Sequence, residues 1–212
     1  NQLSSFGVNI PESNIKAILS TISVGDLVKV SETKMVIYSR AGTIFELETD
    51  KFSIFDTTLR SVDATPNRLS LIYQVLQQSS IESKIGLHFT QQDRENLGTL
   101  LKEKPGSQSF LLALQHFVGR GMGLTPSGDD ILMGFIFMQK LLSYESGMTP
   151  SFVDFISQKT TAISVAYLKN LFNGYISEYF VAFEKAVVEE DYISLQTTVG
   201  TIKAIGHTSG CD

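Results

Sequence analysis

The sequence predicts an α+β protein in which a β-rich N-terminal segment precedes a predominantly helical domain. Before about residue 62, apolar residues occur in short runs rich in β-branched and aromatic side chains, which is typical of strands. After it, they recur every three or four positions, which is typical of helices. A chain of 212 residues can form one domain or two small ones. We therefore expect a β-rich segment over residues 1–62 and a helical domain over residues 63–212.

The first segment should contain one helix and a small sheet. Strands are expected at residues 27–30, 34–38 and 43–48. The last two flank Ser39-Arg40-Ala41-Gly42, a turn sequence that predicts a hairpin. Thr43, Phe45 and Leu47 should share the packed face of the third strand. Apolar residues on one stripe predict a helix over residues 13–23.

The second segment should contain seven helices. Their expected starts are near residues 66, 90, 107, 127, 149, 175 and 192. Pro66 suits a first helical position, and Pro105-Gly106 should end the helix that starts near Thr90. The helix that starts near residue 149 is expected to run without a break to Phe172.

Composition removes several classes of function. A formal net charge of −5 and no Lys/Arg cluster argue against nucleic-acid binding. The most apolar run, residues 131–138, is too short to cross a membrane, and no export signal is recognisable near the start. One cysteine, Cys211, cannot form a disulfide framework, so we expect a cytoplasmic protein.

The most informative segment is the loop Gly119-Arg120-Gly121-Met122-Gly123-Leu124-Thr125-Pro126-Ser127-Gly128-Asp129-Asp130. Its last four residues have a counterpart in Ser209-Gly210-Cys211-Asp212. The loop is neither a dinucleotide fingerprint nor a P-loop, because its glycines are spaced differently and no Gly-Lys-Ser/Thr follows. Since a helix start presents unpaired N–H groups, we expect the two Ser-Gly-x-Asp motifs to form one shared site.

Two kinds of ligand suit this site. Helix N-termini, cationic side chains and hydroxyls would bind a small anion such as phosphate, carbamoyl phosphate or a carboxylate. The candidate anion-binding residues are Arg120, Gly121, Gly123, Thr125, Ser127, Gly128, Asp130, His207, Thr208, Ser209 and Gly210. Asp129, Asp130 and Asp212 would instead hold a hard cation such as Mg²⁺. The residues alone leave both ligands open and identify no catalytic group.

The same motifs also fit a structural role. Ser127 could accept from the third helical N–H while Asp130 reaches back to the cap, as in a capping box. Glycine within a helix costs about 1 kcal/mol relative to alanine, yet both motifs contain one. We therefore expect another group to approach the backbone of Gly128 and of Gly210 closely.

Other candidates are weaker. His116 lies beside apolar residues and is expected to be a core side chain. No His-x-x-x-His or Cys-x-x-Cys pair predicts a zinc site. Cys211 has Asp129 as its counterpart in the first motif, so thiol chemistry shared by both motifs is not expected.

The two motifs carry a family resemblance. Gly-Met-Gly-Leu-Thr-Pro-Ser-Gly-Asp-Asp at residues 121–130 and Gly-His-Thr-Ser-Gly-Cys-Asp at residues 206–212 resemble the AllH-type family, long classed as a domain of unknown function. Its name-bearing member is a subunit of the oxamate carbamoyltransferase of anaerobic allantoin degradation. The resemblance implies a subunit of a complex that converts oxalurate and phosphate to oxamate and carbamoyl phosphate. We expect it to cover most of the chain from the hairpin onward.

Two other functions remain compatible with the residues. One is a non-catalytic helical scaffold whose motifs are capping boxes and which docks partner subunits. The other is a metal-dependent hydrolase, which requires Asp129, Asp130 and Asp212 to converge. The resemblance also implies a helix after the second motif, whereas the sequence stops at Asp212.

Overall fold

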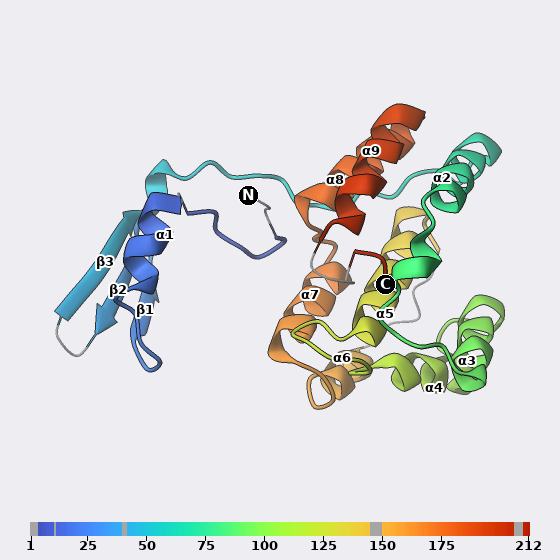
Figure 1. The fold of residues 1–212 in the computed structure, drawn as a ribbon, viewed down its shortest axis with the longest axis horizontal. Helices are drawn as coiled ribbons and strands as arrows, with labels where there is room; N and C mark the ends of the chain where they lie inside the picture. The colour runs from blue at the N-terminus through green and yellow to red at the C-terminus, as the bar shows by residue number, and fades with distance from the viewer. Residues whose placement is uncertain (1–3, 11, 40–41, 145–149, 206–209) are drawn as a thin grey trace. The chain divides into compact units, whose positions relative to one another are not determined.

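The computed structural model describes residues 4–10, 12–39, 42–144, 150–205 and 210–212. It divides into two compact units, one of residues 7–56 and one of residues 57–212 with the short N-terminal stretch up to Phe6. The first unit contains the strands and the second is helical (Figure 1), so the predicted α+β class is confirmed.

The first unit is a three-stranded antiparallel sheet accompanied by short helices. Its elements are α1 (Glu12–Leu19), β1 (Leu27–Val30), β2 (Lys34–Ser39), β3 (Gly42–Glu48) and a single 3₁₀ turn, η1 (Thr49–Lys51). The strand order is β1-β2-β3. Since β1 and β3 are both edge strands, the central strand β2 contributes the most buried side chains of the sheet, Val36 and Ile37.

The predicted hairpin is confirmed, because β2 and β3 pair antiparallel with Ser39 opposite Gly42. The turn residues Arg40 and Ala41 lie outside the described residues. Phe45 and Leu47 are partly buried, as expected. Thr43 is exposed instead, because the register shifts between Ile37 and Tyr38 and a bulge exchanges the faces of neighbouring residues.

The second unit is built from helices that mostly start where the sequence indicates. They are α2 (Pro66–Gln78), η2 (Ile81–Lys84), α3 (Gln91–Lys102), α4 (Gln108–Phe117), α5 (Ser127–Leu141), α6 (Pro150–Ile156), α7 (Ala162–Phe172), α8 (Glu178–Val188) and α9 (Tyr192–Lys203). Thr65 caps α2, Ser107 caps α4 and Asp191 caps α9, each by accepting from a backbone N–H. Thr90 and Asp93 form a complete capping box on α3.

The expectation of one unbroken helix up to Phe172 is wrong. The chain leaves the helical path after Ile156, and α7 starts only at Ala162. The Thr161 side chain accepts from the backbone N–H of Ser164 at 3.1 Å and so caps α7. Residues 157–161 are Ser-Gln-Lys-Thr-Thr and include neither glycine nor proline, so the sequence contains no strong breaker signal at this interruption.

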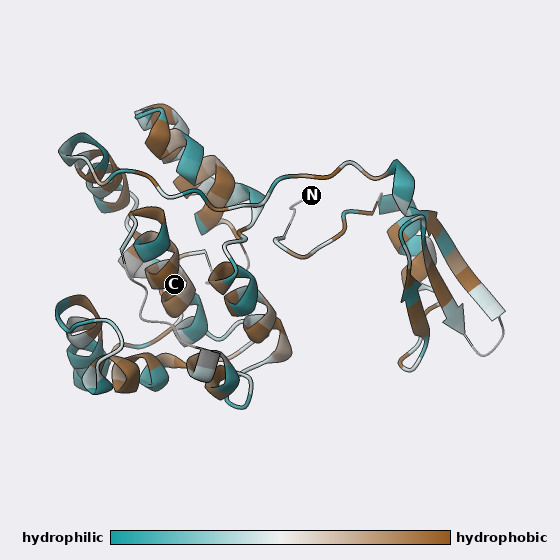
Figure 2. Ribbon diagram, turned by 180° about the vertical axis from the view of Figure 1, so that it is seen from behind, coloured by the Kyte–Doolittle hydropathy of each residue, from teal (hydrophilic) through white to brown (hydrophobic). Residues whose placement is uncertain are grey.

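Helix α5 carries much of the core of the second unit. It packs against α4 and α7, and Leu132, Ile136 and Leu141 on it are fully buried. Figure 2 shows brown, hydrophobic residues along each helix of this unit, next to hydrophilic ones on the same helix. No helix in the described part of the chain is both long and apolar enough to cross a membrane.

Candidate functional site

Asp129, the first aspartate of the first motif, forms hydrogen bonds to two loops, at Gly119 and at Thr160. Its Oδ1 accepts a hydrogen bond from the backbone N–H of Gly119 at 2.7 Å, and its Oδ2 accepts one from the Thr160 hydroxyl. The side chain is fully buried. Both carboxylate oxygens therefore already have donors from the protein, which gives Asp129 a structural role.

The glycines of the two motifs have the same kind of neighbour. A Cβ built on Gly128 would lie 2.1 Å from the carbonyl oxygen of Phe117, at the end of α4. A Cβ on Gly210 would lie 1.8 Å from the carbonyl oxygen of Ile202, near the end of α9. The close approach predicted for both glycines is therefore that of another backbone, the last turn of the preceding helix, in both motifs.

The start of α5 differs from both sequence-based interpretations. The residue before the helix is Pro126, and no side chain caps it, so the predicted capping box at Ser127 is wrong. The N–H of Gly128 donates to the Arg120 carbonyl at 2.8 Å, and the N–H of Asp129 donates to the Pro126 carbonyl at 2.8 Å. The expected open N–H donors at these two residues are therefore occupied. The loop folds back on the helix and satisfies them.

Arg120 binds a protein carboxylate. Its Nη1 donates to Oδ1 of Asp93 on α3, and His116 Nε2 lies 2.7 Å from the same oxygen. Asp93 is fully buried, whereas the Arg120 side chain is 31% exposed. Because a buried carboxylate requires a cation and hydrogen bonds, Arg120 and His116 together stabilise the charge of Asp93. His116 thus has a polar partner instead of a purely apolar surrounding.

One cavity brings residues of both motifs together. It has a volume of about 520 Å³ and lies between α5, α7, α8 and α9. Thr125 and Asp130 line it from the first motif, and Gly210 and Asp212 line it from the second. The remaining lining is mostly apolar and includes Met133, Phe137, Leu171, Ile176, Phe180, Phe183, Val199 and Ile202.

Three polar side chains of the cavity have defined surroundings. Burial raises the pKa of the Tyr167 phenol above its ordinary value of 10.0, and the negative charge of Asp130 raises it further. Asp212 Oδ1 accepts from the N–H of Gly86 at 2.6 Å, while Oδ2 is buried with no hydrogen-bond donor among the described residues. The Lys203 ammonium donates to the Ser79 carbonyl. An ammonium has three N–H donors, and among the described residues Lys203 uses one of them, for Ser79.

The other predicted site residues lie elsewhere or are not described. Arg120, Gly121, Gly123, Ser127, Gly128 and Asp129 are not among the residues that line the cavity. Gly121 and Gly123 are exposed and have positive φ angles of 107° and 102°, which suit glycine in a turn. His207, Thr208 and Ser209 lie outside the described residues.

The three aspartates proposed as metal ligands do not form one cluster. Within the described part of the chain, no group of three or more His, Cys, Asp or Glu side chains is arranged to hold a metal ion. Asp129 binds Gly119 and Thr160, whereas Asp130 and Asp212 line the cavity. The condition that the hydrolase alternative required, convergence of all three carboxylates, is therefore not met.

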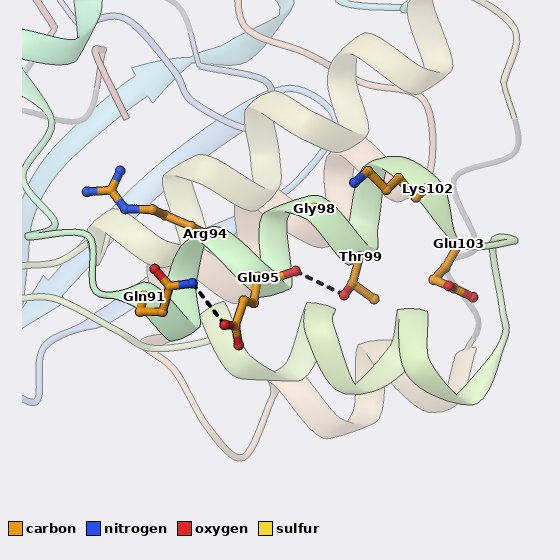
Figure 3. Close-up of a pocket in the computed structure, with 7 residues that line it drawn as sticks. All are labelled: Gln91, Arg94, Glu95, Gly98, Thr99, Lys102 and Glu103. Atoms are coloured by element: carbon orange, nitrogen blue, oxygen red, sulfur yellow. Dashed lines mark hydrogen bonds between the residues drawn. The ribbon is translucent and has the colours of Figure 1, made fainter.

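A second hollow, of about 410 Å³, lies along the surface of α3. Figure 3 shows its seven lining residues, all from this helix and its C-terminal end. Gln91 donates to Glu95 at 3.0 Å, and the Thr99 hydroxyl donates to the Glu95 carbonyl. These are the local side-chain contacts of a solvated helix face. We therefore place the candidate site in the larger cavity, where residues distant in the sequence meet.

The sequence alone did not identify several residues that shape the site. Asp93 and Thr160 bind the motif loop, and Tyr167 and Lys203 line the cavity. The capping pattern of Thr90 and Asp93 was recognisable, but the pairing of Asp93 with Arg120 was not. Tyr167 and Lys203 carried no signal, since each lies on an ordinary helical stripe.

Comparison with known proteins supports one family. No solved structure matches the chain. Residues 117–212 match the family model described as oxamate carbamoyltransferase subunit AllH. The match covers somewhat less than half of the chain and begins at the end of α4, so the expectation that it starts near the hairpin is wrong. The predicted resemblance to the AllH family is confirmed for residues 117–212, the part of the chain that carries both motifs.

Proposed function

We propose that this chain is a subunit of a carbamoyltransferase-type complex and that the cavity between the two motifs binds its carbamoyl-bearing substrate. The observation that carries the proposal is the convergence of Thr125, Asp130, Gly210 and Asp212 on one cavity, within the segment that matches the AllH family. Since the motifs are far apart in the sequence, their meeting is a property of the fold.

The reaction implied by the resemblance is the phosphorolysis of oxalurate. The bond between the carbamoyl carbon and the adjacent nitrogen breaks, a bond from that carbon to a phosphate oxygen forms, and the nitrogen takes up a proton. Oxamate and carbamoyl phosphate are the products. The ligands are thus small anions that also carry amide N–H groups.

The cavity offers groups of both required kinds. The carboxylates of Asp130 and Asp212 accept hydrogen bonds, which suits the N–H groups of a carbamoyl or ureido group. The Lys203 ammonium, which also donates to Ser79, suits a carboxylate or phosphate. Asp130 and Asp212 would hold a Mg²⁺ ion that accompanies a phosphate ligand.

Because the matching family is that of a carbamoyltransferase subunit, catalysis would require partner subunits. A chain with a single cysteine suits a reducing compartment, so we place the complex in the cytoplasm. No Lys/Arg cluster stands out in the sequence, which favours small ligands and proteins over nucleic acid as partners.

The test is reconstitution of the complex purified from its native host. Carbamoyl phosphate formed from oxalurate and phosphate is measured with wild type and with Asp130→Asn, with and without Mg²⁺. We expect activity in the wild-type complex and a loss of at least about tenfold in Asp130→Asn, because the amide is a weaker acceptor than the carboxylate.

The matched control is Asp63→Asn, an exposed aspartate before α2 that does not line the cavity. It should leave activity unchanged. A complex that contains the chain but forms no carbamoyl phosphate would refute the proposed activity. Equal activity of wild type and Asp130→Asn would refute the assignment of the cavity.

A further inference from the structure

Gly134 lies in the middle of α5 and lines the cavity. A Cβ built on it would meet no atom within 4 Å. Glycine in a helix interior costs about 1 kcal/mol relative to alanine. Here neither a positive φ angle nor a close neighbour requires it. The absence of a side chain at this position keeps the cavity open.

The cavity follows one face of α5. Asp130, Met133, Gly134, Phe137 and Met138 line it, and these positions recur at helical spacing. With a rise of about 1.5 Å per residue, Asp130 and Met138 are separated by about 12 Å along the helix axis. The carboxylate therefore lies at one end of this face, and the apolar side chains extend away from it.

The size and chemistry of this space suit a ligand larger than phosphate or oxamate. Pockets for small organic ligands typically measure about 300–1,000 Å³, and this cavity falls in that range. Its apolar wall includes phenylalanines from α5 and α8 and aliphatic residues from α7 and α9. A small ion alone would leave this wall uncovered, whereas an apolar group would remove it from water.

We propose that the cavity binds a ligand in which a ureido or amide head is joined to an apolar body. The head donates to Asp130 and to the buried Oδ2 of Asp212, and the body lies along Met133, Gly134 and Phe137. The choice of a ureido head rests on the proposed function. The apolar body is inferred only from the open space at Gly134 and from the apolar lining of the cavity.

The test uses three compounds that share a benzyl body, namely benzylurea, benzylamine and phenylacetate, together with N-carbamoylglycine, which has a ureido head and no apolar body. Binding to the full chain is followed by chemical-shift changes of its backbone amides. Benzylurea should bind most tightly, and the shifts should include Gly134 and Gly210. N-carbamoylglycine should bind at least about tenfold more weakly, because it covers little of the apolar wall.

Gly134→Leu is the decisive variant. The Cβ of a leucine here meets no atom within 4 Å and leucine favours the helix, so the variant should fold and should lower benzylurea affinity at least about tenfold. Gly200→Leu is the matched control, because Gly200 is an exposed helical glycine on α9 that also meets no atom and does not line the cavity. It should bind benzylurea as wild type does.

Three results would overturn the inference. No shift with any benzyl compound, or equal binding by wild type and Gly134→Leu, would refute the ligand site. Tighter binding of benzylamine or phenylacetate than of benzylurea would refute the ureido head. This test measures binding alone, so its failure is distinct from the absence of phosphorolysis in the reconstituted complex.

Discussion

The carbonyl oxygen of Phe117 lies directly against Gly128, 2.1 Å from where a Cβ would stand. Gly210 has the same relationship to Ile202, at 1.8 Å. In each case, the last turn of a helix rests on the glycine of a Ser-Gly-x-Asp motif. The two motifs therefore share a packing arrangement as well as a sequence, and in both the aspartate two positions after the glycine lines the cavity.

The first prediction concerns these two glycines. Gly128→Ala and Gly210→Ala should each lower the free energy of unfolding by about 3 kcal/mol, because the methyl group collides with backbone that cannot turn away as a side chain can. Gly200→Ala, where a Cβ meets nothing, should be neutral or slightly stabilising. Urea unfolding of the three variants is the measurement. Equal stability of all three would contradict the prediction.

The second prediction concerns Asp129. Asp129→Ala should destabilise the chain by about 2–3 kcal/mol, because the N–H of Gly119 and the hydroxyl of Thr160 lose their acceptor. Thr160→Val should cost less, since one bond to Asp129 remains. In a double-mutant cycle the two changes should couple by about 1 kcal/mol or more. Additive effects would show that the two loops are not joined through Asp129.

The third prediction separates structure from ligand binding at Arg120. Arg120→Gln should lower the free energy of unfolding by about 1–2 kcal/mol, because the buried Asp93 loses its cation while Thr90 and His116 remain. The partial exposure of Arg120 limits the loss. Ligand affinity in the cavity should not change. Arg94→Gln on the exposed face of α3 is the control. If Arg120→Gln lowered ligand affinity and Arg94→Gln did not, Arg120 would be a ligand-binding residue and the prediction would be wrong.

The fourth prediction concerns pH. The pKa of Tyr167 is raised in the folded chain, mainly by burial and secondly by Asp130. The folded state therefore holds this proton more tightly than the unfolded state does. The stability that results is present below pH 10.0 and is lost as the pH rises through the folded pKa.

Urea unfolding from pH 8 to about pH 11.5 measures this effect. Tyr167→Phe should lose less stability above pH 10 than wild type does, and Asp130→Asn should lie between the two. Tyr144→Phe, at an exposed position, serves as the control and should follow wild type. Identical alkaline profiles for wild type and Tyr167→Phe would contradict the prediction.

Local patterns predicted most of the fold. The hairpin of β2 and β3 and the starts of α2, α3 and α4 follow from alternation, from Pro66 and from capping residues, all of which act between residues a few positions apart. The sequence did not predict the break before α7, because some of the contacts that cause the break come from residues distant in the sequence. Thr160 binds Asp129, and Lys159 packs against Gly119, so the motif loop helps to hold the chain out of the helix.

The sequence pointed to some residues of the candidate site but not to their contacts. The repeated Ser-Gly-x-Asp pattern marked Asp130 and Asp212 as members of one site, and both line one cavity. It assigned Arg120 and Asp129 to a ligand, whereas each binds a residue far away in the sequence. A charged side chain pairs with the group that tertiary packing places beside it. The spacing of residues along the chain does not specify that group.

The sequence by itself therefore determined the α+β class, most of the helix and strand starts, the family resemblance and the two motifs, since all of these depend on residue types at short spacing. Only the tertiary structure decided which carboxylates line a cavity and which form hydrogen bonds between loops. It also decided what the glycines contact. Those outcomes depend on close packing between helices that are distant in the sequence, where shape and burial select the partners.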